Sequence, residues 1–200
     1  MTKILLIRHA ATDAVGKKLS GRMPGVHLND EGLMQAQVLA KRLEELTIDF
    51  IYSSPLERAV ETATPIAISR NSEIITSTDF LEINFGEWTN KSFEELKNNS
   101  IFQLFNSFRS STPIPGGESI IEAQTRMITG LQRLTSQHQN VTIAVISHSD
   151  MIKATIAYYA GIHIDMMQRI EISPASVSVI EIYEEISRII LVNHTGNINL

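Results

Sequence analysis

The chain has 200 residues, of which 43% are hydrophobic and 20% are charged, a composition typical of one globular domain with a sizeable core. Its formal net charge of −5 disfavours a nucleic-acid-binding surface, and the absence of cysteine excludes disulfides and thiolate metal sites. No stretch approaches the roughly 20 apolar residues of a membrane span, and the first residues lack a secretory pattern. We therefore expect a cytoplasmic protein with no nucleic-acid or membrane partner.

The first predicted element is a short buried strand over residues 3–7, because four consecutive isoleucine and leucine residues need cover on both faces of a sheet. The apolar run stops at Arg8 and His9. In open α/β sheets, ligands bind outside the carboxyl ends of the strands. This cation and this imidazole therefore mark a candidate binding site.

Residues 13–32 are predicted to form a glycine-rich loop, whose last residues overlap the start of a helix. This helix is capped at Asn29 and runs to about Leu46. Asn29 is suited to cap this helix, since acidic residues that complement the helix dipole come directly after it. Residues 48–52 form a second short apolar run, which predicts a second strand.

The segment after this second strand carries the signals of a helix start. Ser54 and Glu57 have the spacing of a capping box, with a proline between them at the expected first helical position. Arg58 is then predicted to lie in the first turn of the helix, where an anion would bind. We expect Pro65 to kink or interrupt this helix.

Residues 73–83 are predicted to form one or two short strands that end at Leu81 and Glu82. Residues 84–117 contain a loop, a single predicted helix from Ser92 to Phe108 with a stripe of phenylalanines, and a break rich in proline and glycine. We interpret 84–117 as a small cap or lid insertion within one domain that spans residues 1–200.

The second half of the chain continues the alternation of helices and strands. Ser119 and Glu122 form another predicted capping box, at the start of a helix that leads to a third buried strand over 141–146. His148 stands just after this strand, and a helix over 151–160 follows. Alternating apolar residues from 177 to 192 predict a hairpin.

This order of elements predicts a three-layer α/β/α sandwich around a mostly parallel sheet with an antiparallel edge strand. The apolar hairpin offers an edge that would allow a homodimer.

Residues at the predicted strand ends share one chemistry. Two guanidinium groups, Arg8 and Arg58, and two imidazoles, His9 and His148, match the oxygens of a phosphoryl group. A neutral histidine nitrogen in such a cluster would attack phosphorus, and Glu82 would protonate the departing alkoxide. Each of these residues alone is more often structural, so the hypothesis depends on their joint placement.

Arg8-His9-Ala10-Ala11-Thr12 resembles the Arg-His-Gly-Glu-Thr signature of the histidine phosphatase superfamily, which has the phosphoglycerate mutase-like fold. Further stretches resemble that family in the expected order, and the resemblance spans almost the whole chain. They are Ser20-Gly21-Arg22, Leu28 to Gly32, Ser53-Ser54-Pro55-Leu56-Glu57-Arg58-Ala59, Leu81-Glu82, Pro115-Gly116-Gly117-Glu118-Ser119 and Val145-Ile146-Ser147-His148.

The resemblance implies a role for each residue of the cluster. It makes His9 the phosphorylated nucleophile and Glu82 the proton donor, and it places Arg8, Arg58 and His148 around the phosphate. It also implies that Thr12 assists the nucleophile or the substrate, and Arg22 is a further candidate contact for an anionic substrate. The family requires no metal and no cofactor for this chemistry.

The chain departs from the family pattern beside the signature residues. Ala10 stands for a glycine, Ala11 for a glutamate, Val15 for an asparagine and Ser149 for a glycine. None of these departures removes a residue of the expected catalytic set, but they bear on rate and specificity.

Our leading interpretation is a metal-independent phosphomonoesterase of the histidine acid phosphatase type, acting on a small phosphorylated metabolite. The alternatives are a phosphoglycerate-type mutase, a non-catalytic phosphate-binding protein and a His/Glu metallohydrolase.

Overall fold

The computed structural model describes residues 1–184 and 186–198. Its centre is a six-stranded sheet with the strand order β3-β2-β4-β1-β5-β6. The first strand, which contains the apolar run of residues 3–7, therefore has a neighbouring strand on each side, as its hydrophobicity predicts. The strands are β1 (Thr2–Arg8), β2 (Phe50–Ser53), β3 (Ile74–Thr76), β4 (Thr142–Ser147), β5 (Val177–Ile182) and β6 (Ser187–His194).

Strands β1 to β4 are parallel to one another, and β5 and β6 add an antiparallel hairpin at one edge. The register of β1 on β4 pairs Ile7 with Ile146 and Arg8 with Ser147. Both central strands consequently end at the same level, and the backbone N–H of His9 donates to the Ser147 carbonyl at 2.9 Å. This register puts the residues that follow β1 and β4 side by side.

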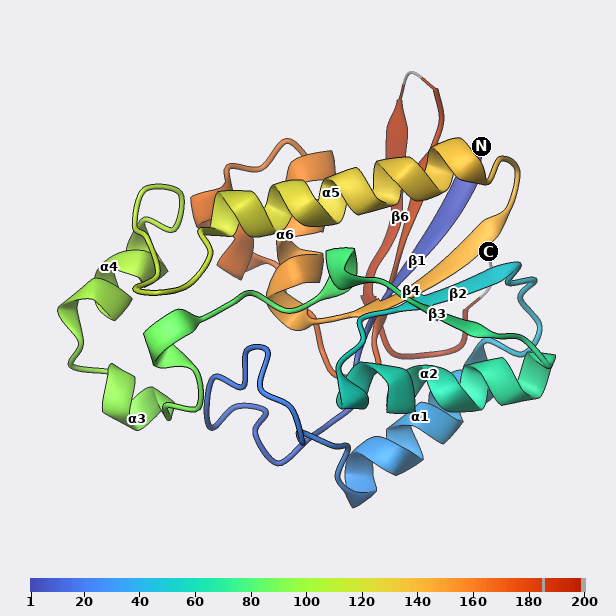
Figure 1. Cartoon of the computed structure of the whole chain (residues 1–200). Helices are drawn as coiled ribbons and strands as arrows, with labels where there is room; N and C mark the ends of the chain where they lie inside the picture. Colours follow the sequence, from blue (N-terminus) through green and yellow to red (C-terminus); the bar gives the residue numbers. More distant parts are fainter. Residues whose placement is uncertain (185, 199–200) are drawn as a thin grey trace.

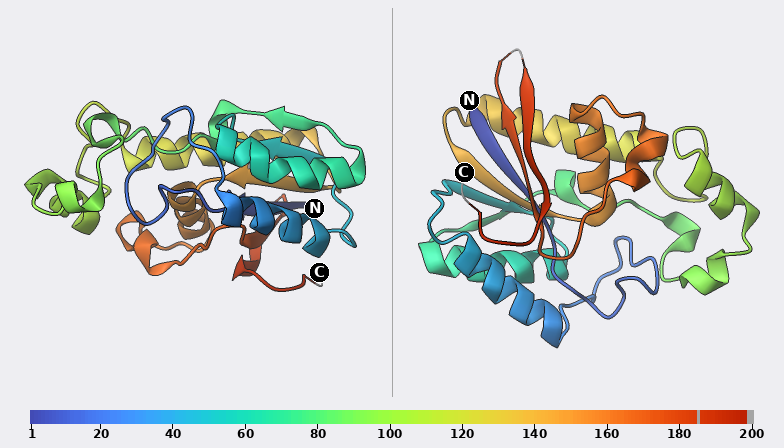
Figure 2. Two further views of the ribbon diagram at one scale, coloured as in Figure 1. Left: turned by 90° about the horizontal axis from the view of Figure 1, so that it is seen from below. Right: turned by 180° about the vertical axis from the view of Figure 1, so that it is seen from behind.

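Helices cover both faces of the sheet, which gives the predicted three-layer architecture (Figures 1 and 2). Alternate side chains of β1 point to opposite faces, so Leu5 and Ile7 join one core cluster while Ile4 and Leu6 join the other. The first cluster packs under α1 (Asp30–Arg42) and α2 (Glu57–Arg70). The second packs under α5 (Ile120–Gln137) and α6 (Ser149–Tyr159).

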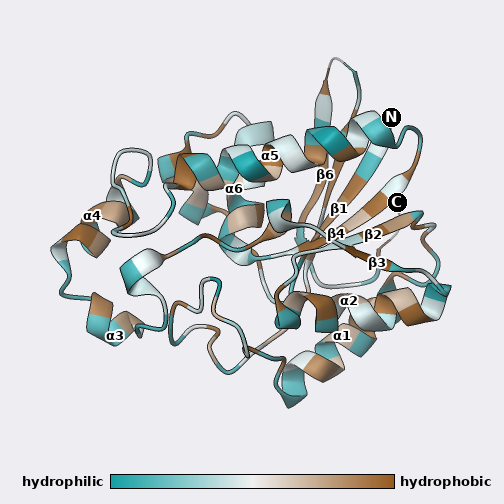
Figure 3. Ribbon diagram, in the orientation of Figure 1, coloured by the Kyte–Doolittle hydropathy of each residue, from teal (hydrophilic) through white to brown (hydrophobic). Residues whose placement is uncertain are grey.

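Figure 3 shows the hydropathy that underlies this packing: the central strands are largely hydrophobic, and the helices alternate between hydrophilic and hydrophobic residues. The α/β/α fold with an antiparallel sheet edge is thus confirmed. Within the residues that the structure describes, no helix has the length and apolar character needed to cross a membrane.

Two predicted helix starts have different outcomes. The capping box of Ser119 and Glu122 is present at the start of α5. The box of Ser54 and Glu57 was wrong, because α2 begins at Glu57 with Leu56 as its N-cap. The Glu57 carboxylate instead accepts a hydrogen bond from the backbone N–H of Gly25 at 3.0 Å.

Helix α2 also continues through Pro65 to Arg70, so Pro65 does not interrupt the helix, and the alternative of a kink stays a prediction. The nearby residues Ala63 and Ile66 are fully buried in the sheet-facing cluster. Tertiary packing of this kind overrides the low helix propensity of a single residue.

The region before and within residues 84–117 is less regular than the sequence predicts. After β3 comes a 3-10 turn, η1 (Thr78–Phe80), so Glu82 lies on an irregular segment and not at the end of a strand. The predicted helix over 92–108 is divided into α3 (Phe93–Leu96) and α4 (Ser100–Ser107). The Asn99 side chain caps the second of these by accepting from the Phe102 N–H at 2.9 Å, which starts a new helix there.

Segment 84–117 also contains the short turn η2 (Gly86–Trp88), and a further turn, η3 (Ile164–Arg169), follows α6. The rings of Phe102 and Phe105 pack against the buried Trp88, with ring centroids 5.2 and 5.3 Å from it. In Figure 1 this green segment lies beyond the end of the sheet where β1 and β4 finish. It thereby forms one wall of the site described next.

Candidate active site

The ends of β1 and β4 and the start of α2 bring the two imidazoles and a guanidinium together. The rings of His9 and His148 are 5.2 Å apart between centroids in an edge-to-face arrangement. Arg58 Nη2 lies 3.3 Å from His148 Nδ1. All three side chains are buried. The convergence on which the phosphate-binding hypothesis depends is therefore present.

His9 is held as a neutral imidazole with a defined tautomer. Its Nδ1 lies 2.7 Å from the Ala10 carbonyl oxygen, and because a carbonyl only accepts, Nδ1 carries the proton. Burial and the charges of Arg58 and Arg8 lower the pKa of His9 to about 3. Nε2 consequently keeps its lone pair at neutral pH, as nucleophilic attack requires.

His148 has the opposite tautomer. The Arg58 guanidinium only donates, so Nδ1 of His148 is the acceptor and Nε2 donates to Ser54 Oγ at 2.9 Å. Burial, followed by the charge of Arg58, lowers the pKa of His148 well below its usual value. Ser54 thus orients this ring, whereas the sequence had suggested a helix cap for it.

The two arginines have unused hydrogen-bonding capacity. Arg58 Nη2 donates to the Gly21 carbonyl at 2.8 Å, and Arg8 Nη1 donates to the Ile172 carbonyl at 2.6 Å. Across residues 1–184 and 186–198, however, Arg58 Nη1 and Arg8 Nε have no hydrogen-bond partner although both atoms are buried. Buried donors of this kind are costly unless an anion satisfies them, which suits a phosphoryl group.

Glu82 has the properties of a proton carrier. Its Oε1 accepts from the backbone N–H of Ile83 at 2.9 Å. Desolvation and the nearby negative charge of Asp150 raise the pKa of Glu82 to about 7, against the opposing effect of Arg58 and Arg8. A carboxyl group with this pKa is able both to give and to take a proton near neutral pH.

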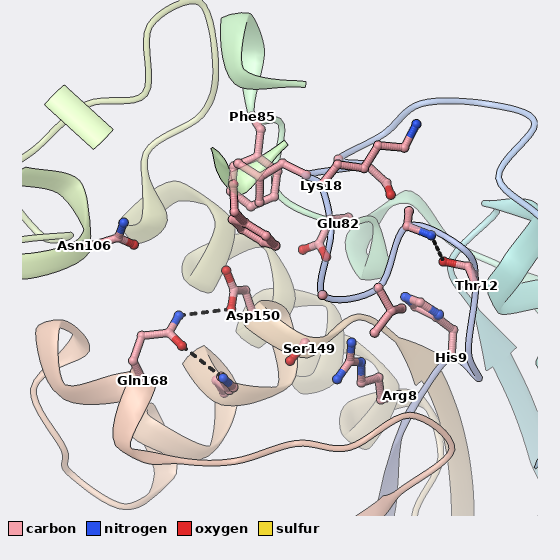
Figure 4. Close-up of a pocket in the computed structure, with 18 of the residues that line it drawn as sticks. Arg8, His9, Thr12, Lys18, Glu82, Phe85, Asn106, Ser149, Asp150 and Gln168 are labelled. Carbon is pink, nitrogen blue, oxygen red and sulfur yellow. Dashed lines mark hydrogen bonds between the residues drawn. The ribbon is translucent and has the colours of Figure 1, made fainter. Parts of the chain in front are cut away.

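These groups line a cavity of about 570 Å³ (Figure 4). Arg8, His9, Thr12, Arg58 and Glu82 all contribute to its wall. The Thr12 hydroxyl also accepts from the Ala14 N–H at 3.3 Å.

Two predicted contact residues, His148 and Arg22, are not among the described residues that line the cavity, although the ring of His148 packs 5.2 Å from the ring of His9 behind the cavity wall. Arg22 Nε donates to the carbonyl oxygen of Glu82 at 2.8 Å, and Arg22 Nη2 pairs with Glu118 at 2.7 Å. Arg22 therefore holds the segment that carries Glu82.

Several cavity residues were missed by the sequence reasoning. Asp150 could have been predicted from the sequence, because it stands two residues after His148 at the same predicted strand end. Lys153 lies one helical turn after Asp150 on the same helix, whereas Arg109 and Gln168 gave no signal, since long-range packing alone brings them to the cavity. Within the described parts of the chain, no three His, Asp or Glu side chains gather in a way that would hold a metal ion.

Comparison with known proteins agrees with this geometry. The profile of the histidine phosphatase superfamily (branch 1) matches residues 4–195. Phosphoserine phosphatase 1 of Hydrogenobacter thermophilus is 31% identical over 98% of this chain and 93% of its own length. The 2,3-bisphosphoglycerate-dependent phosphoglycerate mutase of Thermoplasma acidophilum is 29% identical over 93% of this chain and 89% of its own.

Among solved structures, a mutant of the phosphoserine phosphatase of Entamoeba histolytica in complex with phosphoserine superposes with a TM-score of 0.88. It is 28% identical, and the match covers 100% of both chains. The extent of these matches, over a sheet and a site of the expected kind, identifies the chain as a member of the histidine phosphatase superfamily, branch 1.

Proposed function

We propose that this protein is a metal-independent phosphomonoesterase that hydrolyses a small phosphorylated metabolite through a phosphohistidine intermediate on His9. The observation that carries the proposal is that His9 and Glu82 line the same cavity and have complementary protonation properties. One is held neutral with a free Nε2, and the other has a pKa raised to about 7 in the same cavity. A nucleophile and a general acid with these properties are what phosphoryl transfer to nitrogen needs.

In the first step, Nε2 of His9 attacks phosphorus and forms a P–N bond while the P–O ester bond breaks. The proton of Glu82 passes to the departing alkoxide, which leaves as an alcohol. The unused donors of Arg8 and Arg58 stabilise the charge on the phosphoryl oxygens.

In the second step, the ionised Glu82 takes a proton from water, and the resulting hydroxide attacks phosphorus. The P–N bond breaks, phosphate forms, and His9 returns to its neutral state. Glu82 is protonated again and the enzyme is ready for the next turnover.

Segment 84–117 is the proposed cap of this site. Phe85, Phe102, Phe105 and Arg109 from this segment line the cavity opposite the strand ends. Aromatic side chains at this position form an apolar wall next to the reacting groups, which strengthens the electrostatic interactions inside.

A phosphoglycerate-type mutase is the second candidate. The similarity to the Thermoplasma acidophilum mutase favours it, and chain length does not separate the two activities because that match covers most of both chains. Both activities use the same phosphohistidine, so they differ only in whether water or a second substrate accepts the phosphoryl group.

Turnover of 3-phosphoglycerate, with and without a bisphosphoglycerate primer, separates the candidates. We expect release of inorganic phosphate that the primer does not accelerate and a chelator does not reduce. Primer-dependent isomerisation faster than phosphate release would establish the mutase. Loss of activity in chelator would favour a metallohydrolase, and phosphate binding without any turnover would favour a non-catalytic protein.

A further inference from the structure

The part of the cavity away from His9 contains two side chains of opposite charge that lie close together without a hydrogen bond between them. Arg109, from segment 84–117, and Asp150, from the first turn of α6, both line the cavity. Arg109 Nη1 is 3.7 Å from Asp150 Oδ2, which is beyond normal hydrogen-bond distance. The two charges therefore attract each other without a hydrogen bond between them.

The Arg109 guanidinium is buried, with only 5% of the residue exposed. Its Nη2 donates to Asn106 Oδ1 at 2.8 Å, and its carbon atom lies 4.4 Å from the centre of the Phe105 ring. In the described part of the chain, its Nε and Nη1 have no hydrogen-bond partner. This cation is fixed in place and retains donors for an anionic group.

Asp150 is held from the other side by a short chain of hydrogen bonds. Gln168 Nε2 donates to Asp150 Oδ1 at 3.2 Å, and Lys153 Nζ donates to Gln168 Oε1 at 3.0 Å. Figure 4 shows the Asp150 side chain in the cavity, with Gln168 on one side and Glu82 on the other. Asp150 thus offers a carboxylate to any group bound next to the proton donor.

We propose, on the basis of the phosphatase function above, that Arg109 and Asp150 bind the leaving group of the substrate. The substrate class that fits is a phosphate monoester whose alcohol carries an ammonium and a carboxylate together. The ammonium would bind Asp150 and the carboxylate would bind Arg109. Two charge-assisted hydrogen bonds then replace one loose ion pair, which offsets the cost of separating the two side chains.

The simpler alternative is that the pair only attaches segment 84–117 to α6. That alternative predicts the same change in activity for every substrate when either residue is replaced. Recognition predicts a change that depends on the charges of the leaving group.

Four alkyl phosphates distinguish substrate recognition from a purely structural role. All four have leaving groups that need the proton of Glu82, and they differ in the charges that the leaving group carries. Phosphoserine carries both charges, phosphoethanolamine only the ammonium, 3-phosphoglycerate only the carboxylate, and glycerol 3-phosphate neither. We expect the wild-type kcat/KM to be at least about 10-fold higher for phosphoserine than for glycerol 3-phosphate, as one or two charge-assisted contacts provide. Equal values for the four esters in the wild type would overturn the inference without any variant.

Two variants then show which residue binds which charge of the leaving group. For each protein, the kcat/KM of every ester is divided by the value for glycerol 3-phosphate. Asp150→Asn should lower this ratio about 10-fold for phosphoserine and phosphoethanolamine but not for 3-phosphoglycerate. Arg109→Gln should lower it for phosphoserine and 3-phosphoglycerate but not for phosphoethanolamine. Uniform ratios in both variants would overturn the inference.

The matched control is Asp165→Asn. Asp165 accepts from the N–H and hydroxyl of Ser110, at 2.7 and 3.0 Å, and so ties the same segment to η3. Asp165 is not among the described residues that line the cavity, so its replacement should leave all ratios unchanged.

The outcomes also separate this inference from the function on which it depends. Hydrolysis of glycerol 3-phosphate that requires His9, but shows no preference for charge, would overturn the inference alone. Hydrolysis that persists in His9→Ala would overturn the proposed function and the inference with it.

Discussion

His148 and Ser54 are linked by a 2.9 Å hydrogen bond in which the ring Nε2 donates to the hydroxyl. This bond, together with the 3.3 Å approach of Arg58 to Nδ1, fixes the tautomer of a fully buried imidazole. It connects the end of β2 to the end of β4 directly beneath the proposed phosphate site.

Ser54→Ala should therefore leave a buried N–H without its partner. We expect a loss of about 1–3 kcal/mol in the free energy of unfolding, with weaker binding of inorganic phosphate. Urea unfolding and a phosphate titration measure the two effects. Ser136→Ala, on the exposed face of α5, is the control. Unchanged stability and unchanged phosphate affinity in Ser54→Ala would show that the bond does not orient the ring.

The stability of the protein should fall as the pH is lowered below about 6.5, the ordinary pKa of histidine. Below that pH the unfolded chain binds protons at His9, whereas the folded protein does not until the pH approaches about 3. His9→Gln should therefore lose less stability than the wild type between pH 7 and pH 4.5. Urea midpoints at the two values test this, with the exposed His163→Gln as the control. The same loss in all three proteins would contradict the neutral state of His9.

Glu82→Gln should slow alkyl phosphates far more than activated aryl phosphates, because a good leaving group departs without a proton. We expect a loss of about 10²–10⁴-fold in kcat on glycerol 3-phosphate and a much smaller loss on p-nitrophenyl phosphate. The decline of kcat/KM on the alkyl ester as the pH rises through about 7 should also disappear. Glu87→Gln replaces an exposed neighbouring carboxylate and serves as the control. Equal losses on both esters would exclude Glu82 as the acid.

Gly32 allows the loop after His9 to pack against α1. A Cβ at this position would overlap the carbonyl oxygen of Ala11, which also accepts from the N–H of Asn29 at 3.1 Å. Gly32→Ala should displace this loop, lower the stability by about 1–3 kcal/mol and reduce kcat. Leu33→Ala, an exposed position in the same turn, should do neither. Wild-type activity in Gly32→Ala would show that the loop tolerates the shift.

Much of the fold could be predicted from local patterns. Apolar runs such as residues 3–7 end sharply at polar residues, and these ends marked β1, β2 and β4 and the position of His148. The capping box at Ser119 identified the start of α5 because both of its hydrogen bonds are local. The parallel register then placed the strand-end residues together.

The errors come from interactions between distant parts of the chain. The Glu57 carboxylate binds Gly25, and Ser54 binds His148, so neither caps α2. Arg109 reaches the cavity only because segment 84–117 folds back over the sheet end. Spacing within the sequence carries no information about such contacts.

Direct detection of the covalent intermediate tests the central claim. The wild-type protein is mixed with a phosphate ester, denatured within the first turnover at alkaline pH, digested and analysed by mass spectrometry. We predict a phosphoryl group on His9, and no phosphorylated peptide and no turnover in His9→Ala. Full turnover in that variant, or a phosphoryl group on another residue, would contradict the account.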